Sequence, residues 1–298
     1  MPQQSREIRK RIRSVSNTQK ITRTMEMVAT SKLKRAQGRV VASGPYFEGL
    51  RKLMADLAGK ELDLERYPLF APREVKRVLM LVVTANRGLC GGFNANLVRA
   101  AMAAIREERA AGHDVVLHVA GRKGIAAFRF AGYEMARTYT DFPDRPEDED
   151  AERLLPSLVD PFLKGEVDQV KVVYAHFQSI GRQPPTVRTL CPVGAPSAAE
   201  GQAASAPAAA SSGVDILFEP SQEDILDELL PLYVRNMIYR VLIESVASEQ
   251  VARRLAMKRA SDNAEDMVKS LRRKYNSARQ AQITQELAEI LGGSEALK

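Results

Sequence analysis

The sequence predicts an α/β fold: a long antiparallel coiled coil of N- and C-terminal helices plus a globular α/β domain. Three observations lead to this prediction. Both ends of the chain carry long stretches in which apolar residues recur at helical spacing and helix breakers are rare. The last of these stretches is so long that its apolar stripe needs a partner helix. The middle of the chain alternates strand-like apolar runs with helical patterns, which is typical of a mostly parallel, Rossmann-like sheet.

The N-terminal coiled-coil helix is expected over residues 1–60. No Gly or Pro occurs between Gln3 and Gln37, so nothing breaks the helix there. Glycines and one proline further on weaken the pattern, but apolar residues at helical spacing continue beyond them. The apolar stripe predicted for this helix consists of Ile8, Ile12, Val15, Ile21, Met25, Val28 and Leu33.

The C-terminal coiled-coil helix is expected over residues 221–292 and is predicted to pair with the N-terminal one. No Gly or Pro occurs between Leu232 and the pair Gly292-Gly293, which is a helix stop signal. Pro231 indicates that the helix starts late or bends there. About seventy residues at ~1.5 Å rise give a helix of roughly 100 Å, too long for one globular domain to bury. The stripe predicted for its second half consists of Ala264, Met267, Leu271, Tyr275 and Ala278.

The globular α/β domain is expected over residues 70–220. Its predicted strands and helices, in chain order, cover residues 75–84, 94–110, 114–120, 122–130, 152–163, 167–176 and 187–191. The acidic segment 143–150 is interpreted as a linker. Residues 194–213 are rich in Ala, Ser, Gly and Pro, which predicts a disordered surface loop. A further strand, VDILFEP at residues 214–220, is expected to lead into the C-terminal helix.

Charge and cysteine content limit which partners and which cellular compartment are expected. The net charge of +7 and the pI near 9.4 favour an acidic or polyanionic partner. Between Met1 and Arg39 there are many Lys and Arg residues but only two acidic residues, Glu7 and Glu26. Cys90 and Cys191 fit no metal or redox spacing and indicate a reducing compartment. No apolar run approaches the ~20 residues that span a bilayer, and the basic N-terminal pattern runs past the usual length of a transit peptide.

The best candidate for a phosphate-binding turn is TANRGLCGGFNAN, residues 84–96. A Gly-rich turn from strand to helix can present N–H groups to an anion. Its glycines, however, match neither GxxxxGK[ST] nor GxGxxG. The alternative interpretation is a tight turn that lets helix and strand pack closely. The three histidines do not lie at metal-ligand spacing, and no Ser/His/Asp arrangement predicts a catalytic site.

The basic N-terminal helix leaves three interpretations open. It could bind nucleic acid through phosphate contacts, although no aromatic residues are interleaved with the basic ones. It could carry a solvated charged face. It could also be a basic rod inside an acidic protein sleeve.

Several blocks of the sequence resemble the gamma subunits of the F-type ATP synthase. They are IRKRIRSVSNTQKITRTMEMVATSKLKRAQ near the N-terminus, TANRGLCGGFNANL in the middle, and ESVASEQVARRLAMKRASDNA followed by YNSARQAQITQELAEIL near the C-terminus. The resemblance implies a central rotor shaft that needs no cofactor and performs no chemistry itself. Proton flow turns it through a membrane ring, and it changes the conformation of catalytic β subunits that make ATP from ADP. The implied partners are the α and β subunits, the epsilon subunit and the membrane c-ring, and not nucleic acid.

The resemblance also implies which residues touch the β subunits. Met25 corresponds to a methionine near an acidic β-subunit loop. Arg279 and Gln280 match a pair that bonds an acidic "catch" loop, which suits the bidentate fork of arginine. Thr284 lies one helical turn from Gln280 and can face the same partner.

Further contacts follow from the same resemblance. Glu249 and Arg253 match SEQxAR, lie four residues apart, and are expected to form a polar contact set with the β subunits near Met25. Glu219 is expected to meet the polar loop of the membrane ring. Its neighbour Phe218 replaces a tyrosine of some family members, which puts any hydrogen bond from that position in doubt. The implied location is the cytoplasmic side of a bacterial inner membrane, since no dithiol insert like that of the light-regulated plant members is found.

Overall fold

The computed structural model describes residues 3–58, 66–194 and 222–295. Its elements in chain order are α1 (Gln3–Ala58), β1 (Arg77–Val83), α2 (Phe93–Ala110), β2 (Asp114–Ala120), α3 (Arg122–Phe130), β3 (Arg137–Tyr139), α4 (Asp148–Leu163), β4 (Gln169–Ala175), β5 (Pro185–Cys191) and α5 (Gln222–Glu295). The chain divides into two compact units: unit 1 is Met1–Thr30 with Arg253–Lys298, and unit 2 is Ser31–Ala252. Both α1 and α5 therefore contribute to both units.

Unit 2 is built on a five-stranded sheet with the order β3-β2-β1-β4-β5. The first four strands are parallel, and β5 runs antiparallel to β4. Side chains of β1 alternate between two cores, because successive residues of a strand point to opposite faces. Leu79 and Leu81 join one core, and Met80 and Val82 join the other. The predicted α/β class with a mostly parallel sheet is confirmed.

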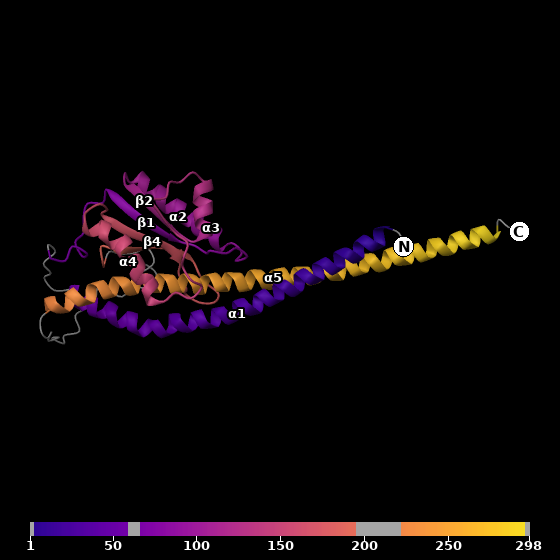
Figure 1. Cartoon of the computed structure of the whole chain (residues 1–298), viewed down its shortest axis with the longest axis horizontal. Coiled ribbons are helices and arrows are strands. Elements are labelled where there is room, and N and C mark those ends of the chain that lie inside the picture. The colour runs from indigo at the N-terminus through magenta and orange to yellow at the C-terminus, as the bar shows by residue number, and fades with distance from the viewer. Residues whose placement is uncertain (1–2, 59–65, 195–221, 296–298) are drawn as a thin grey trace. The chain divides into compact units, whose positions relative to one another are not determined.

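Helices cover both faces of this sheet. In Figure 1, α2 and α3 lie on one face, and α4 lies on the other with the unit 2 segments of α1 and α5. The second face carries the larger core, which includes Leu50 of α1, Leu158 of α4 and Val234 of α5. The helix α5 therefore packs against the sheet through a core that several elements share.

The structure corrects one predicted element boundary and adds one strand that was not predicted. Of the segment interpreted as a linker, Asp148, Glu149 and Asp150 form the first turn of α4, where their charges suit the positive end of the helix dipole. Glu147 donates its N–H to Asp150 Oδ2 at 2.9 Å, which caps this helix. The three-residue strand β3 was not predicted, because it has no apolar run.

The helix α5 passes through both of its predicted weak points. Pro231 lies inside it, and the helix continues through Gly292-Gly293 to Glu295, so the predicted stop is wrong. A glycine costs a helix only about 1 kcal/mol and does not end it by itself. The predicted strand 214–220 and the predicted loop 194–213, apart from Gly194, lie outside the described residues.

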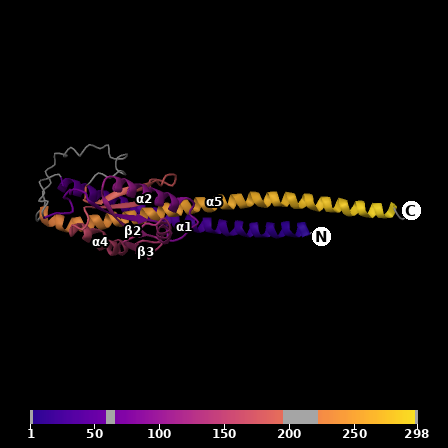
Figure 2. The ribbon, with the colours of Figure 1, turned by 90° about the horizontal axis from the view of Figure 1, so that it is seen from above.

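Unit 1 is an antiparallel coiled coil of α1 and α5, as predicted. Figure 2 shows the N- and C-terminal ends of the two helices at the same end of the pair. Buried and half-buried residues recur at alternating spacings of four and three, which is the heptad pattern of a coiled-coil seam. The seam residues are Ile8, Ile12, Val15, Gln19, Thr22, Glu26 and Ala29 on α1, and Met257, Ser261, Ala264, Val268, Leu271, Tyr275 and Ala278 on α5.

The predicted apolar stripe is wrong in the middle of this seam. Ile21, Met25 and Val28 are 56%, 39% and 51% exposed, and Thr22 and Ala29 are buried in their place. Small side chains occupy these seam positions, and the Thr22 hydroxyl is satisfied by donating to the Thr18 carbonyl at 3.1 Å. The sequence interpretation favoured the larger side chains. On α5, Met267 is exposed in the same way and its neighbour Val268 is buried.

Candidate functional site

The Gly-rich turn after β1 packs against the start of α3. The Thr84 hydroxyl accepts the N–H of Gly124 at 3.0 Å, and the Asn86 side-chain oxygen accepts the N–H of Arg122 at 3.1 Å. An anion at a helix start binds through such N–H groups. Because the turn itself already bonds them, the start of α3 does not support phosphate binding.

The second half of the turn closes over a small core. The Asn94 side chain accepts the N–H of Ala85 at 2.9 Å and lies 3.1 Å from the Cys90 sulfur. Cys90 is only 2% exposed and packs with Phe93 at the start of α2. Close packing of helix and strand is thus the interpretation that the structure favours for this turn.

The carboxyl edge of the sheet between β1 and β4 is where open α/β sheets usually bind ligands, because the connection after β1 leads to β2 on one side and the connection after β4 leads to β5 on the other. In this chain α5 occupies that edge. Ser248 donates its hydroxyl to the Ala175 carbonyl at 3.0 Å, and Ala252 packs against the small core under the turn. The chain's own helix thus packs against the edge at which a nucleotide-dependent enzyme would be expected to bind its ligand.

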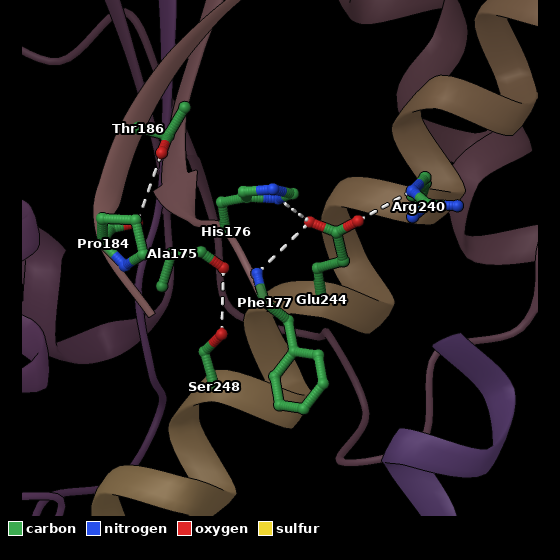
Figure 3. A network of polar contacts seen from close by, with 8 residues as sticks. All are labelled: Ala175, His176, Phe177, Pro184, Thr186, Arg240, Glu244 and Ser248. Atoms are coloured by element: carbon green, nitrogen blue, oxygen red, sulfur yellow. Dashed lines mark hydrogen bonds and ion pairs between the residues drawn. The ribbon is translucent and has the colours of Figure 1, made fainter. Parts of the chain in front are cut away.

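A buried carboxylate lies at the same edge. Glu244 of α5 is fully buried, and Figure 3 shows it between His176 and Arg240. Its carboxylate oxygens lie 2.5 Å from His176 Nδ1, 3.4 Å from the Phe177 nitrogen and 2.7 Å from Arg240 Nε. Burial opposes ionisation, but the hydrogen bond and charge of His176, with the charges of Arg240 and Arg188, outweigh it and lower the pKa of Glu244. Glu244 is therefore ionised at neutral pH.

The other histidines belong to the packing of unit 2. His118 is 6% exposed, and its Nδ1 lies 3.3 Å from the Tyr139 hydroxyl. Burial lowers the pKa of His118 to about 4, so that it is neutral at physiological pH. His113 lies 2.8 Å from Glu108. Among the residues that the structure describes, no group of His, Cys, Asp and Glu could hold a metal ion.

Four of the contact residues implied by the resemblance lie exposed on unit 1. Met25 is on α1, outside the seam. Arg279, Gln280 and Thr284 lie on neighbouring turns of α5, where Thr284 donates its hydroxyl to the Gln280 carbonyl at 3.0 Å. The structure thus brings the last three together on one helix, while Arg253, also in unit 1, is half-buried.

The remaining contact residues lie elsewhere. Glu249 belongs to unit 2, where it is half-buried and lines a small cavity with Asn86 and Phe142. The polar contact that Glu249 and Arg253 were expected to make with the β subunits stays a prediction. Phe218 and Glu219 lie outside the described residues.

Sequence reasoning missed Glu244 and His176 as a pair. The available signal was the lone acid in the apolar run VLIESVA, preceded one helical turn earlier by Arg240. A buried acid in such a run needs a partner, but the partner is 68 residues away and only the fold supplies it.

In the segments described, no helix offers an apolar stretch of the length that crossing a membrane requires.

Comparison with known proteins agrees along the whole chain. A protein family described as ATP synthase matches residues 4–297. The chain is 47% identical over 296 residues to the ATP synthase gamma chain of Gemmatimonas aurantiaca, which covers 98% of both chains. It is 41% identical over 292 residues to the gamma chain of Leptospira biflexa, again over 98% of both.

Solved structures share the fold. A chain of the rotor of Euglena gracilis mitochondrial ATP synthase superposes with a TM-score of 0.63 at 16% identity, covering 94% of this chain and 99% of that one. A chain from the central stalk and c-ring of the Tetrahymena thermophila mitochondrial enzyme gives 0.60 at 22% identity, covering 81% and 99%. From its sequence relatives, the chain belongs to the ATP synthase gamma chain family.

Proposed function

We propose that this chain is the central rotor shaft of an ATP synthase, and that it couples proton flow through a membrane ring to conformational cycling of the catalytic β subunits. The observation that carries this proposal is the likeness to gamma chains over nearly the full length of the chain. Physically, a shaft with unlike sides has a different interaction energy with each conformation of a catalytic site. Turning it shifts the populations of those conformations, and ADP is converted to ATP.

The surface of unit 1 supports a role inside a surrounding partner. With the seam already closed, Ile21, Met25 and Val28 still form an exposed apolar stripe on α1, at the spacing of one helix face. Ile283 and Leu287 are exposed in the same way on α5. Exposed apolar stripes indicate interaction sites, and the basic character of the first helix suits a sleeve with acidic loops.

The contact residues are part of the proposal. Residues proposed to touch the β subunits are Met25, Glu249, Arg253, Arg279, Gln280 and Thr284, and Phe218 and Glu219 are proposed to touch the membrane ring. The exposure of Arg279, Gln280 and Thr284 on one helix supports the first set. The chain itself carries out no chemistry. It works with the α, β and epsilon subunits and the c-ring, peripherally on the cytoplasmic side of a bacterial inner membrane.

Assembly tests the proposed function. We expect the purified chain, mixed with α and β subunits from the same source, to form a complex that holds one copy of the chain with the α–β hexamer. Native mass spectrometry would measure the stoichiometry. Absence of a complex with matched subunits would overturn the proposal. Salt-sensitive DNA binding at physiological ionic strength would instead favour the nucleic-acid alternative.

Met25→Lys is expected to uncouple the complex without preventing its assembly. Met25 is partly exposed and lies outside the seam, so the coiled coil tolerates the change. A lysine beside the proposed acidic loop favours one shaft orientation over the others by an ion pair worth up to about 1 kcal/mol at an exposed site. The protons pumped per ATP hydrolysed, measured in vesicles, should fall severalfold.

The matched control is Met27→Lys. Met27 is 61% exposed and, two residues from Met25, points from another side of α1. This control should keep the normal ratio of protons to ATP. Equal ratios in both variants would remove the special role assigned to Met25.

A further inference from the structure

We propose that Glu244 is a positioning residue: it fixes the rotational setting of α5 against the carboxyl edge of the sheet, so that torque carried by α5 is resisted by the core of unit 2. The inference rests on the proposed shaft function and adds the site at which the helix is held. All of the residues involved belong to unit 2.

Apolar contacts alone hold α5 only loosely against rolling. Leu242 packs into the large core, and Ile243 and Ala247 pack against Ala36 and Val40 of α1. Such contacts contribute most of the attraction, but the hydrophobic effect is not directional. A helix that rolls slightly exchanges one apolar neighbour for another, so these contacts define its rotation poorly.

The Glu244 carboxylate makes directional bonds that define the rotation of α5 about its axis. His176 and Phe177 approach it from the end of β4, whereas Arg240 lies one turn away on α5 itself (Figure 3). A register shift of α5 by one residue turns the carboxylate by about 100° about the helix axis, moves it by about 1.5 Å along the axis, and separates it from both groups that follow β4. A buried charge without its partners is strongly unfavourable, so one setting of the helix is preferred over its neighbours.

A second polar contact lies one turn further along the same face of α5. Ser248 bonds the carbonyl of Ala175, the residue that precedes His176 in the chain. His176 is held in place in turn. Its backbone N–H donates to the carbonyl of Pro184, just before β5, at 3.0 Å. Two successive turns of α5 are thus bonded to the last residues of β4, which fixes both rotation and axial position.

The surroundings favour the ionised carboxylate. Arg188 of β5 adds a positive charge that lowers the pKa of Glu244. Tyr174 of β4 has a raised pKa, because it is buried and because Glu244 is negatively charged. The charge of Glu244 therefore interacts with residues of both β4 and β5, and removing the charge should weaken these interactions together.

Glu244→Gln tests the inference, since it keeps the size of the side chain and removes its charge. The variant is assembled with its partner subunits and the membrane ring in vesicles. We expect ATP hydrolysis to persist, the protons pumped per ATP to fall severalfold, and the torsional stiffness of the shaft in single-molecule rotation to decrease. His176→Gln provides a second route from the β4 side, at a residue whose side chain is 24% exposed, and the same direction of change is expected.

Two controls separate positioning from mere stability. Asp114→Asn removes a charge from the exposed pair with Arg77 and should change neither pumping nor stiffness. Leu158→Ala opens a cavity in the core on α4 and should lower the melting temperature without lowering the ratio of protons to ATP.

Normal stiffness and pumping in Glu244→Gln and His176→Gln would overturn the inference. A fall in the ratio for Leu158→Ala as large as that for Glu244→Gln would overturn it as well, because coupling would then follow stability alone. Neither result touches the proposed function, which fails only if the unaltered chain does not assemble with its partners or does not couple pumping to hydrolysis.

Discussion

Gly121→Ala is expected to destabilise unit 2 strongly. Gly121 adopts φ +96°, and a Cβ built there would lie 2.2 Å from the Thr84 carbonyl oxygen. The Thr84 carbonyl is part of the backbone, so it cannot move away as the end of a flexible side chain could. Relief would separate the ends of β1 and β2, where the Thr84 N–H donates to the Ala120 carbonyl at 2.8 Å. We expect a loss of more than about 4 kcal/mol, a large part of the ~5–15 kcal/mol that stabilises a typical domain.

Gly132→Ala is the matched control. Gly132 also has a positive φ, +75°, but no atom lies within 4 Å of the position that its Cβ would take. Only the backbone strain remains, about 1–2 kcal/mol. Urea unfolding of both variants gives the two free energies, and similar losses would contradict the close approach of β1 and α3 as the reason for a glycine at position 121.

Ala29→Glu is expected to separate the two helices of unit 1. Ala29 is 1% exposed in the seam, where a glutamate would be buried without a partner or force the helices apart. We expect a loss of about 3 kcal/mol or more, in the range measured when a charge is left unpaired in a protein interior. Hydrogen exchange of α1 amides in residues 3–30 would report the opening.

Val28→Glu distinguishes the seam from the stripe first expected from the sequence. It introduces the same charge one residue earlier, at a position that is 51% exposed. The change in stability should stay within about 0.5 kcal/mol, as for most surface substitutions. Greater protection in Ala29→Glu than in Val28→Glu would show that the seam has been assigned to the wrong residues.

Sequence reasoning predicted the elements whose patterns are strong. The apolar run of β1 and the breaker-free ends of the chain led to the strand and the two long helices. It failed where side-chain size and structural role disagree. Thr22 and Ala29 carry little apolar surface, yet they lie in the seam. The acids before Asp150 have the composition of a linker, yet they begin α4.

The site residues also fall into those that the sequence could suggest and those that it could not. Met25, Arg279 and Gln280 could be proposed because neighbouring residues form recognisable blocks. The contact between Glu244 and His176 could not be found, since it depends on how the sheet and α5 pack. The two residues are 68 positions apart in the sequence, and that separation says nothing about whether they meet in the folded chain. A lone charge in an apolar helical run was the one signal that such a partner exists.

The two parts of unit 1 come from opposite regions of the sequence, Met1–Thr30 and Arg253–Lys298. During synthesis on the ribosome, the first part emerges early and has no partner until residues beyond Arg253 have been made. An isolated helix of this kind is only marginally stable in water. Residues 31–252 can meanwhile complete their own core. The order of translation therefore makes the coiled coil the last part of the chain to fold, and until then its basic, amphipathic first helix is open to chaperones and to premature association.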